Sequence, residues 1–272
     1  MANNEGKEMS FLAHLEELRW HLVRSFVAIL IVAIVVFIFQ KQIYEEFLLA
    51  HRSPDFLTYR GFCNFFSIFG AESGFCNISF KGELQSLKVT QQFMNSIWTS
   101  LILGFIVAFP YVLWEIWRFI APGLHENEIK KSRGFIFIAS LLFFIGVLFS
   151  FYVILPMSVY FFYSYEITDM IQNQFTMDSH IGLVTNTLLG VAIMFELPVI
   201  IYFLSKIGLI TPEFLKKYRK HALVLVLVLS AIITPPDVAS QIIVSIPILI
   251  LYEVSIKVSK RVIKNQEKKY AK

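Results

Sequence analysis

The sequence predicts an all-α, polytopic membrane protein with six transmembrane helices, of which the last two are short. Hydrophobic residues make up 56% of the 272 residues and charged residues only 16%, whereas a soluble domain is about a quarter charged. Several uncharged runs also approach the roughly 20 residues that a membrane-spanning helix needs. Such long apolar runs exclude a transmembrane β-barrel, whose strands are short and alternate.

The first three spans are separated by one long and one short polar segment. We expect these spans at about residues 20–42, 93–117 and 134–157. The apolar run from Val23 to Phe39, interrupted only by Arg24, is longer than the roughly 7–15-residue core of a signal peptide, so it is expected to stay in the protein. Pro156 marks the expected end of the third span. The loop at about residues 44–92 is long enough to carry a small structure of its own.

The last three spans are expected at about residues 182–205, 220–234 and 240–258. Before the fifth span, Thr211 and Pro212 read as the N-cap and first residue of a helix. The apolar parts of the last two spans reach only about 18 Å at 1.5 Å per residue, well short of a roughly 30 Å hydrocarbon core. Either the bilayer thins there or polar flanks extend the helices in a wet, protein-lined region. We find no internal repeat and predict one membrane domain, residues 1–272.

The distribution of basic residues predicts the orientation. With six spans, 19 of the 24 Lys and Arg residues fall on the side that holds both termini. Basic residues concentrate in cytoplasmic segments, so both termini are expected in the cytoplasm. The 44–92 loop is then extracytoplasmic.

Cys63 and Cys76, the two cysteines of the chain, both lie in this loop. In an oxidising compartment they could form a disulfide, and two free thiols are the alternative. His51 is not at zinc-ligand spacing from them, and we expect neither a metal nor a cofactor.

Glu196 stands alone in the apolar stretch from Ile181 to Leu204 and is followed two residues later by Pro198. A charge at membrane depth costs several kcal/mol unless it faces water or a partner. Such a residue is a functional candidate by default. A titrating site in a proton pathway is one interpretation, and a polar group that meets a partner is another.

The N-terminal segment contains leucines at helical spacing, which predicts an amphipathic helix at the interface before the first span. Glu17 lies largely off its apolar face. Its simplest interpretation is a solvated helix charge, paired with His21 four residues later. Likewise Glu126 and Glu128, in the loop after the second span, could merely cap the next helix.

Four short motifs in register resemble the TatC family, the core subunit of the twin-arginine protein translocase. They are His14-Leu15-x-Glu17-Leu18-Arg19, Trp117-x-Phe119-Ile-Ala-Pro122-Gly-Leu124 with Glu128, Phe195-Glu196-Leu197-Pro198, and Thr234-Pro-Pro-Asp237-x-x-Ser240-Gln241. Each motif is weak evidence alone. The four motifs occur in this order around six spans, and the resemblance covers nearly the whole chain.

The resemblance implies that two cytoplasmic acids recognise signal peptides with consecutive arginines. By motif position these acids are Glu17 and Glu128, and Glu16 and Glu126 are their adjacent rivals. A carboxylate pairs with a guanidinium through two parallel hydrogen bonds that lysine cannot reproduce. The residues expected to shape the same patch are His14, Leu18, Arg19, Phe119, Pro122 and Leu124.

The resemblance also assigns roles within the membrane. Glu196 matches the intramembrane glutamate of the family, and Asp237 matches the acid of its Pro-Pro-Asp turn. Thr234, Asp237 and Gln241 are expected to contact the transmembrane helix of a partner, because a polar side chain in hydrocarbon gains by finding a hydrogen-bond partner. Asp237 also suits the N-cap of the sixth helix.

We therefore expect a signal-peptide receptor that exports folded proteins with the proton-motive force, and not an enzyme. The sequence contains neither a phosphate-binding glycine loop nor a serine elbow. Expected partners are TatA- and TatB-type single-span subunits, twin-arginine signal peptides, membrane lipid and further copies of the chain, with no nucleic acid. The expected location is the bacterial cytoplasmic membrane. The alternatives are a proton- or ion-coupled small-molecule transporter titrating at Glu196 and a membrane scaffold.

Overall fold

The computed structural model describes residues 11–68, 74–76, 78, 80, 83–120, 132–168, 170, 173–233 and 238–270. The chain divides into two units, residues 1–39 with 100–140 and residues 40–99 with 141–272, which we describe separately. Six residues singled out above lie outside the described residues: Pro122, Leu124, Glu126, Glu128, Thr234 and Asp237.

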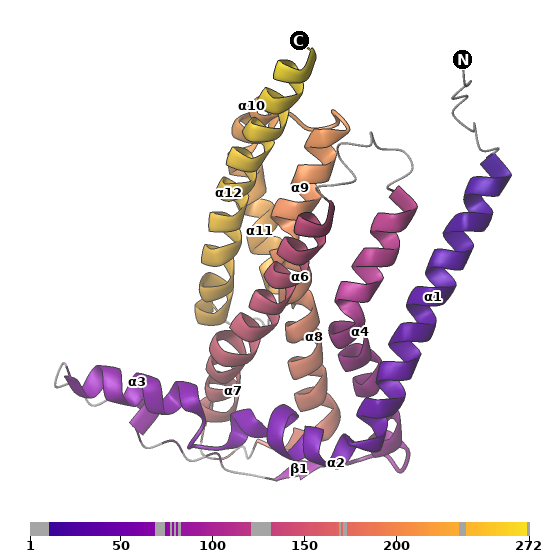
Figure 1. Ribbon diagram of the computed structural model, residues 1–272. Helices are drawn as coiled ribbons and strands as arrows, with labels where there is room; N and C mark the ends of the chain where they lie inside the picture. Colours follow the sequence, from indigo (N-terminus) through magenta and orange to yellow (C-terminus); the bar gives the residue numbers. More distant parts are fainter. Residues whose placement is uncertain are drawn as a thin grey trace. The chain divides into compact units, whose positions relative to one another are not determined.

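The first unit is built on two long helices that lie side by side (Figure 1). They are α1 (Phe11–Ile38) and the larger part of α4 (Gln91–Ile120). A Cβ on Gly104 would lie 2.9 Å from the Ile29 carbonyl oxygen and 3.0 Å from the Ala33 Cβ. A glycine at this position therefore permits the close approach of α4 to α1.

α1 corrects one expectation about the N-terminal segment. We expected a separate interfacial helix before the first span, but α1 is one continuous helix from Phe11. Between Arg19 and Val23 the chain contains neither Gly nor Pro, so nothing there interrupts the helix. Glu17 consequently sits in the first turns of the membrane helix itself.

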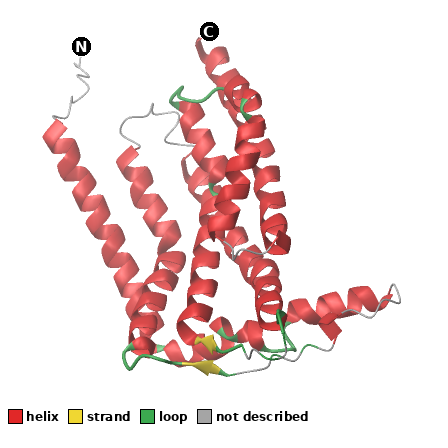
Figure 2. Cartoon of the chain, turned by 180° about the vertical axis from the view of Figure 1, so that it is seen from behind, coloured by secondary structure: helices red, strands yellow, loops and turns green. Residues whose placement is uncertain are grey.

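The second unit contains the remaining long helices (Figure 2). In order these are α6 (Ser132–Phe149, from residue 141 on), the π-turn η5 (Ser150–Ile154), α7 (Leu155–Ser164), α8 (Met177–Phe195), α9 (Leu197–Lys206), α10 (Pro212–Lys217), α11 (Arg219–Ile233) and α12 (Val238–Tyr270). Its core joins Ile154, Val191, Phe195, Val226, Val244 and Ile248. This cluster brings η5, α8, α11 and α12 together around the middle of the helices.

Two helix ends differ from the sequence-based boundaries. The helix does not stop at Pro156, because η5 leads straight into α7, where this proline sits in the first turn. Pro156 has no N–H to bond to the preceding turn, and the Tyr152 carbonyl of that turn accepts a hydrogen bond from the Thr58 hydroxyl instead. α12 continues to Tyr270, well beyond the expected end near residue 258. Its segment Gln241–Gln266 is long and apolar enough to cross a membrane, so the expectation of a short sixth helix was wrong.

Local capping follows the sequence. The Thr211 side chain accepts a hydrogen bond from the Phe214 N–H at 3.2 Å, and Pro212 is the first residue of α10. Both observations agree with the predicted helix start.

The long loop and the start of α7 form a small substructure. It comprises α2 (Gln40–Ile43), η1 (Tyr44–Leu48), η2 (Ala50–Arg52), α3 (Leu57–Ile68), η3 (Gly74–Cys76) and β1 (Leu84–Gln85), which pairs in parallel with β2 (Phe175–Thr176). At its centre, the buried Tyr59 hydroxyl donates to the carbonyls of His51 and Pro156 at 3.0 and 2.9 Å. Cys63 and Cys76 form a disulfide with a Cα–Cα distance of 4.9 Å.

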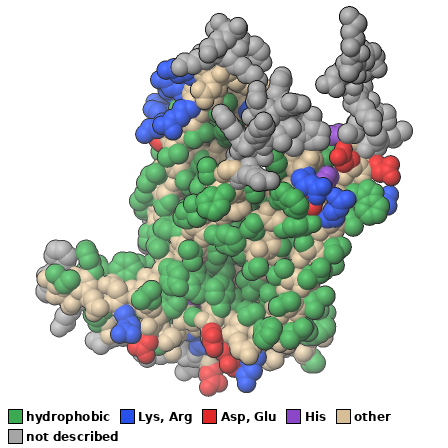
Figure 3. All heavy atoms as spheres, in the orientation of Figure 1, with side chains coloured by type: hydrophobic (Ala, Val, Ile, Leu, Met, Phe, Trp, Pro, Cys, Tyr) green, Lys and Arg blue, Asp and Glu red, His purple; other side chains and the backbone are tan. Residues whose placement is uncertain are grey.

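Five helical segments of the described chain are long and apolar enough to cross a membrane. They are His14–Ile38, Gln91–Ile120, Ile136–Ser164, Met177–Lys206 and Gln241–Gln266. α11, with 15 residues, is too short to be among them. In Figure 3, hydrophobic side chains cover the middle stretch of the helices, and charged side chains gather toward their ends, as a bilayer requires.

Candidate functional site

A buried carboxylate, Glu115, connects α1 to α4 in the first unit. Its side chain is 1% exposed, and Oε2 lies 2.5 Å from His21 Nδ1. The Tyr111 hydroxyl donates to Oε1 at 3.0 Å, and Arg118 Nη1 donates to the same oxygen at 3.4 Å. Arg24 Nη1 adds a contact of 3.8 Å to Oε2. We call Glu115 with these four partners the Glu115 cluster.

The predicted recognition residues of α1 lie beside this cluster. The His14 ring stacks on Phe119 with centroids 4.5 Å apart, and the His21 ring meets the same phenyl ring edge-on at 6.2 Å. Glu17 and Leu18 are half-buried, whereas Arg19 is exposed and lies over the Trp20 ring at 5.7 Å. We call His14, Glu17, Leu18, Arg19 and Phe119 the α1 patch.

The structure shows which carboxylate His21 meets. His21 does not pair with Glu17 at i+4, as the simplest interpretation held, because its Nδ1 bonds to Glu115. Glu16 is exposed, whereas Glu17 is half-buried. The patch therefore offers a carboxylate, Glu17, that the imidazole of His21 does not occupy.

Sequence reasoning missed Glu115 and His21. The signal was present, since Glu115 is an acid inside the second apolar run. Its partner His21 is 94 residues away, however, and no local spacing rule reaches that far.

Glu196 presents the opposite environment in the second unit. It caps the C-terminus of α8, and α9 begins at the next residue with Pro198 in its first turn. The residue is 7% exposed. Among the described residues, neither carboxylate oxygen has a hydrogen-bond partner.

The helices around Glu196 pack tightly. A Cβ on Gly146 of α6 would lie 2.9 Å from the Ala192 Cα and 3.0 Å from the Phe195 Cβ. The Phe149 ring also contacts the Phe195 ring at 5.8 Å. Glu196 thus follows directly on a closely packed stretch of α8.

Of the three predicted partner-contact residues, only Gln241 is described. Its side-chain amide donates to the Leu227 carbonyl at 3.0 Å, which connects α12 to α11. The amide therefore has a partner within the chain, and any contact to another subunit adds to this bond.

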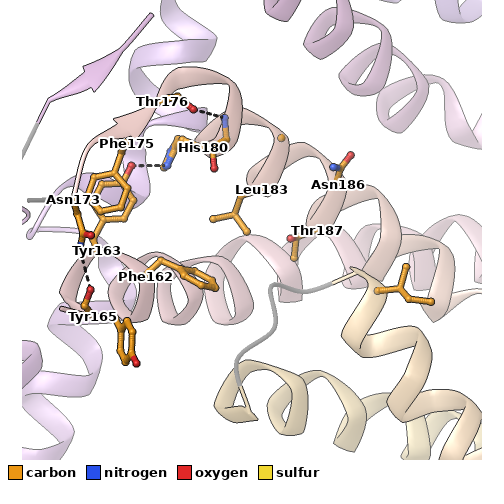
Figure 4. Close-up of a pocket in the computed structure, with 13 residues that line it drawn as sticks. Phe162, Tyr163, Tyr165, Asn173, Phe175, Thr176, His180, Leu183, Asn186 and Thr187 are labelled. Carbon is orange, nitrogen blue, oxygen red and sulfur yellow. Dashed lines mark hydrogen bonds between the residues drawn. The ribbon is translucent and has the colours of Figure 1, made fainter. Parts of the chain in front are cut away.

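A cavity of about 590 Å³ lies at the end of α8 that carries β2 (Figure 4). It is lined by uncharged side chains, aromatic ones such as Phe162 and Phe175 and polar ones such as Asn173. The Tyr163 hydroxyl and His180 Nδ1 lie 3.1 Å apart at its wall. Thr187 is fully buried there, and its hydroxyl has no partner among the described residues. Without a charged group the cavity does not suit an ionic ligand.

The described part of the chain contains no group of three or more His, Cys, Asp or Glu side chains that could hold a metal ion. His51, buried outside the spans, donates a hydrogen bond from Nε2 to the Phe151 carbonyl oxygen at 2.9 Å. Because an imidazole Nε2 facing a carbonyl must donate, Nε2 carries the proton. Burial lowers the pKa of His51 from 6.5 to about 4.

Comparisons with known proteins agree over almost the whole chain. Residues 13–247 match the family described as Sec-independent protein translocase protein (TatC). The TatC protein of Blattabacterium sp. subsp. Periplaneta americana is 41% identical over 257 residues, covering 94% of this chain and 97% of that protein. TatC of Helicobacter pylori (strain ATCC 700392 / 26695) is 35% identical over 249 residues, covering 92% and 87%.

The fold agrees as well. A crystal structure of a twin-arginine translocase receptor, TatC, superposes with a TM-score of 0.70 at 34% identity, covering 92% of this chain and 99% of that chain. The same four motifs, the all-helical membrane fold and the full-length similarity lead to one conclusion. The chain belongs to the TatC family and is a subunit of the Sec-independent, twin-arginine protein translocase.

Proposed function

We propose that this TatC subunit is the receptor for twin-arginine signal peptides and that Glu17 and Glu128 bind the two arginines. The half-buried Glu17 in the α1 patch is the observation that carries this proposal. A guanidinium forms two parallel, charge-assisted hydrogen bonds with a carboxylate. The two acids, Glu17 and Glu128, would each bind one arginine of the pair.

The Glu115 cluster supports this role electrostatically. Arg24 and Arg118 lie near the α1 patch and would repel an incoming arginine. Both lie within 4 Å of Glu115, so its negative charge offsets theirs. The stacked His14 and Phe119 rings supply an aromatic surface on which an arginine side chain can rest.

Glu196 would serve the apolar core of the signal peptide after the arginines have docked. Its oxygens have no partner among the described residues, so it can accept or donate hydrogen bonds to a peptide or helix that enters the membrane beside it. No basic side chain among the described residues bonds to the Glu196 carboxylate, which favours a role for its polarity over a role for its charge.

TatA- and TatB-type single-span subunits are the proposed partners, and Thr234, Asp237 and Gln241 are their proposed contact residues. The short α11 supports this, since its 15 residues are too few to cross a hydrocarbon core of roughly 30 Å. A partner helix gains by hydrogen bonding to a polar side chain at membrane depth. Several copies of the chain are expected to assemble in the receptor complex.

We propose the bacterial cytoplasmic membrane as the location, with both termini in the cytoplasm. Nineteen of the 24 basic residues then lie on the cytoplasmic side, as the positive-inside rule requires. The Cys63–Cys76 disulfide would lie on the oxidising side. Export of folded proteins would be driven by the proton-motive force.

The test is capture of the membrane protein by immobilised signal peptides that differ only in Arg-Arg or Lys-Lys. We expect the Arg-Arg peptide to retain the protein and the Lys-Lys peptide to lose it. In cross-linking, Glu128→Lys should abolish contact with the Arg-Arg peptide, and the adjacent Glu126→Lys should retain it. Unchanged cross-linking of Glu128→Lys would contradict the assignment.

A further inference from the structure

We propose that α3 is a lipid-binding helix that lies in the membrane interface and is held there by the Cys63–Cys76 disulfide. Its partner is the bilayer leaflet next to this end of the spans. In Figures 1 and 2, α3 runs across the direction of α7 and α8 and extends away from them. Helices that lie in the interface plane have this orientation.

The sequence of α3 separates into distinct faces. Tyr59 is fully buried against the rest of the unit. Leu57, Phe65 and Ile68 are 69%, 55% and 79% exposed, and a helix places them on one side at spacings of eight and three residues. Arg60 and Ser67 form a polar, exposed side, and Asn64 lies at the border between this side and the apolar one. Three large exposed apolar side chains on a 12-residue helix are unusual where only water surrounds them.

Contacts with η5 show which way the apolar side faces. The Thr58 hydroxyl bonds to the Tyr152 carbonyl, and the Phe56 ring stacks on the Tyr152 ring at 6.0 Å. Phe65 follows Thr58 by two helical turns and therefore lies on the same side of α3. The side of α3 that carries Phe65 thus faces the part of η5 that contains Tyr152.

Tyr152 marks the end of a lipid-facing stripe. Along α6 and η5 the exposed apolar residues recur every three or four positions, at Phe137, Leu141, Ile145, Leu148 and Tyr152. The next residues on that side, Leu155 and Pro156, are buried. Tyrosine is enriched at membrane–water interfaces. The apolar side of α3 therefore continues the exposed apolar surface of a helix that is long and apolar enough to cross a membrane, which is why we assign lipid as its partner.

The disulfide explains why α3 can extend from the bundle without unfolding. An isolated 12-residue helix is marginal in water. Cys63, in the middle of α3, is bonded to Cys76 at the end of η3, so the returning chain is fastened to α3. The Phe80 ring then lies 5.9 Å from Tyr59 at the base of the helix. This arrangement leaves the side with Leu57, Phe65 and Ile68 exposed.

Charge agrees with the same orientation. Arg60, the charged residue of α3, lies on the polar side. In Figure 3 the charged side chains near the base of this extension lie on its edge away from the bundle, and hydrophobic side chains lie on the edge toward it. An interfacial helix places its charges in water and its apolar residues among acyl chains in this way.

Spin labels on neighbouring residues test the proposal. The native cysteines are joined in a disulfide, so a cysteine introduced into the full-length protein is the thiol that reacts with a nitroxide reagent. Ile68→Cys and its matched control Ser67→Cys would be reconstituted into phosphatidylethanolamine–phosphatidylglycerol vesicles. Mass spectrometry after alkylation would verify the native disulfide.

We expect the label at residue 68 to collide severalfold more often with oxygen, which concentrates in lipid, than with a water-soluble nickel chelate. The label at residue 67 should show the reverse. Equal exposure of both labels to the nickel chelate would overturn the proposal. Shielding of residue 68 from both reagents would also overturn it, because that result means a protein contact, from a partner or a second copy. If either variant fails to fold, Phe65→Cys with Arg60→Cys on the polar side provides a second matched pair with the same expectations.

Discussion

Two buried glutamates of this chain, Glu115 and Glu196, face opposite environments. Glu115 is contacted by His21, Tyr111, Arg24 and Arg118 within 4 Å. Glu196 has no hydrogen-bond partner among the described residues. A buried charge that lies among partners stabilises a structure only as long as all of them stay. A buried polar group without partners is costly and is retained for what it binds. The first residue therefore holds α1 against α4, and the second is available to a ligand.

The largest expected effect comes from removing the paired carboxylate. Glu115→Ala leaves His21 and two arginines without their common partner, so the free energy of unfolding should fall by about 3–5 kcal/mol. Glu115→Gln keeps the hydrogen bonds but loses the charge and should cost less. Thermal unfolding in detergent measures both. Equal stability of Glu115→Ala and the parent protein would contradict the conclusion that Glu115, unlike Glu196, stabilises the fold.

His51 extends the comparison to a buried ionisable group outside the spans, where the effect of pH can be measured. Burial, with a smaller contribution from nearby His180, lowers its pKa to about 4. In the unfolded chain the pKa of His51 is near 6.5, whereas the folded chain binds this proton only at lower pH, near 4. Stability from this residue is therefore complete above pH 6.5 and is lost as pH falls toward 4, by up to about 3 kcal/mol.

Unfolding measured between pH 7.5 and 4.5 checks this expectation. The parent protein should lose stability through the window, and His51→Gln should lose less of it. Parallel curves for the two proteins would show that His51 is not the group responsible.

The third expected effect concerns the helix approach on which the Glu115 cluster depends. Gly104→Ala adds a Cβ 2.9 Å from the Ile29 carbonyl oxygen, which forces α1 away from α4 and should cost about 1–3 kcal/mol. Gly182→Ala in α8 makes the same chemical change where the Cβ meets nothing within 4 Å. That control should be neutral or stabilised by up to about 1 kcal/mol. Similar unfolding temperatures for both variants would mean that the close approach is not required.

The smallest expected effect on stability comes from Glu196. Replacing a buried polar group that has no partner by an apolar one is close to neutral, so Glu196→Leu should change the free energy of unfolding by less than about 1 kcal/mol. Export of a twin-arginine substrate should nevertheless fall, and Glu196→Gln should retain it, because the amide keeps the polarity. If Glu196→Gln loses export as fully as Glu196→Leu, the charge is required.

The chain shows which features are local enough to be predicted from sequence. Neighbouring residues are enough to predict the N-cap at Thr211 and the start of α10 at Pro212. Hydropathy alone shows that Glu196 is a single acid in an apolar stretch. The apolar runs likewise indicate where the long helices lie, because burial in lipid requires length and composition alone.

Other features depend on tertiary contacts and escaped prediction. The His21–Glu115 pair joins residues 94 positions apart, so the i+4 rule assigned His21 the wrong partner. Pro156 was expected to end a helix, but η5 shifts the backbone hydrogen bonds by one residue just before it, and the helix continues. The apolar residues of α3 did not show from sequence which side of the helix is exposed. The structure shows it, because Tyr59 is buried whereas Leu57, Phe65 and Ile68 are exposed.

Recognition of two arginines by the α1 patch is tested most directly by the binding of Arg-Arg and Lys-Lys signal peptides to Glu17→Gln, with Glu16→Gln as the matched control. A charge-assisted hydrogen bond contributes about 1.5–3 kcal/mol, which corresponds to roughly 10–100-fold in affinity. Glu17→Gln should therefore lose the preference for Arg-Arg by about that factor, and Glu16→Gln should keep it. A Glu17→Gln protein that still prefers Arg-Arg as strongly as the parent would contradict the assignment of Glu17.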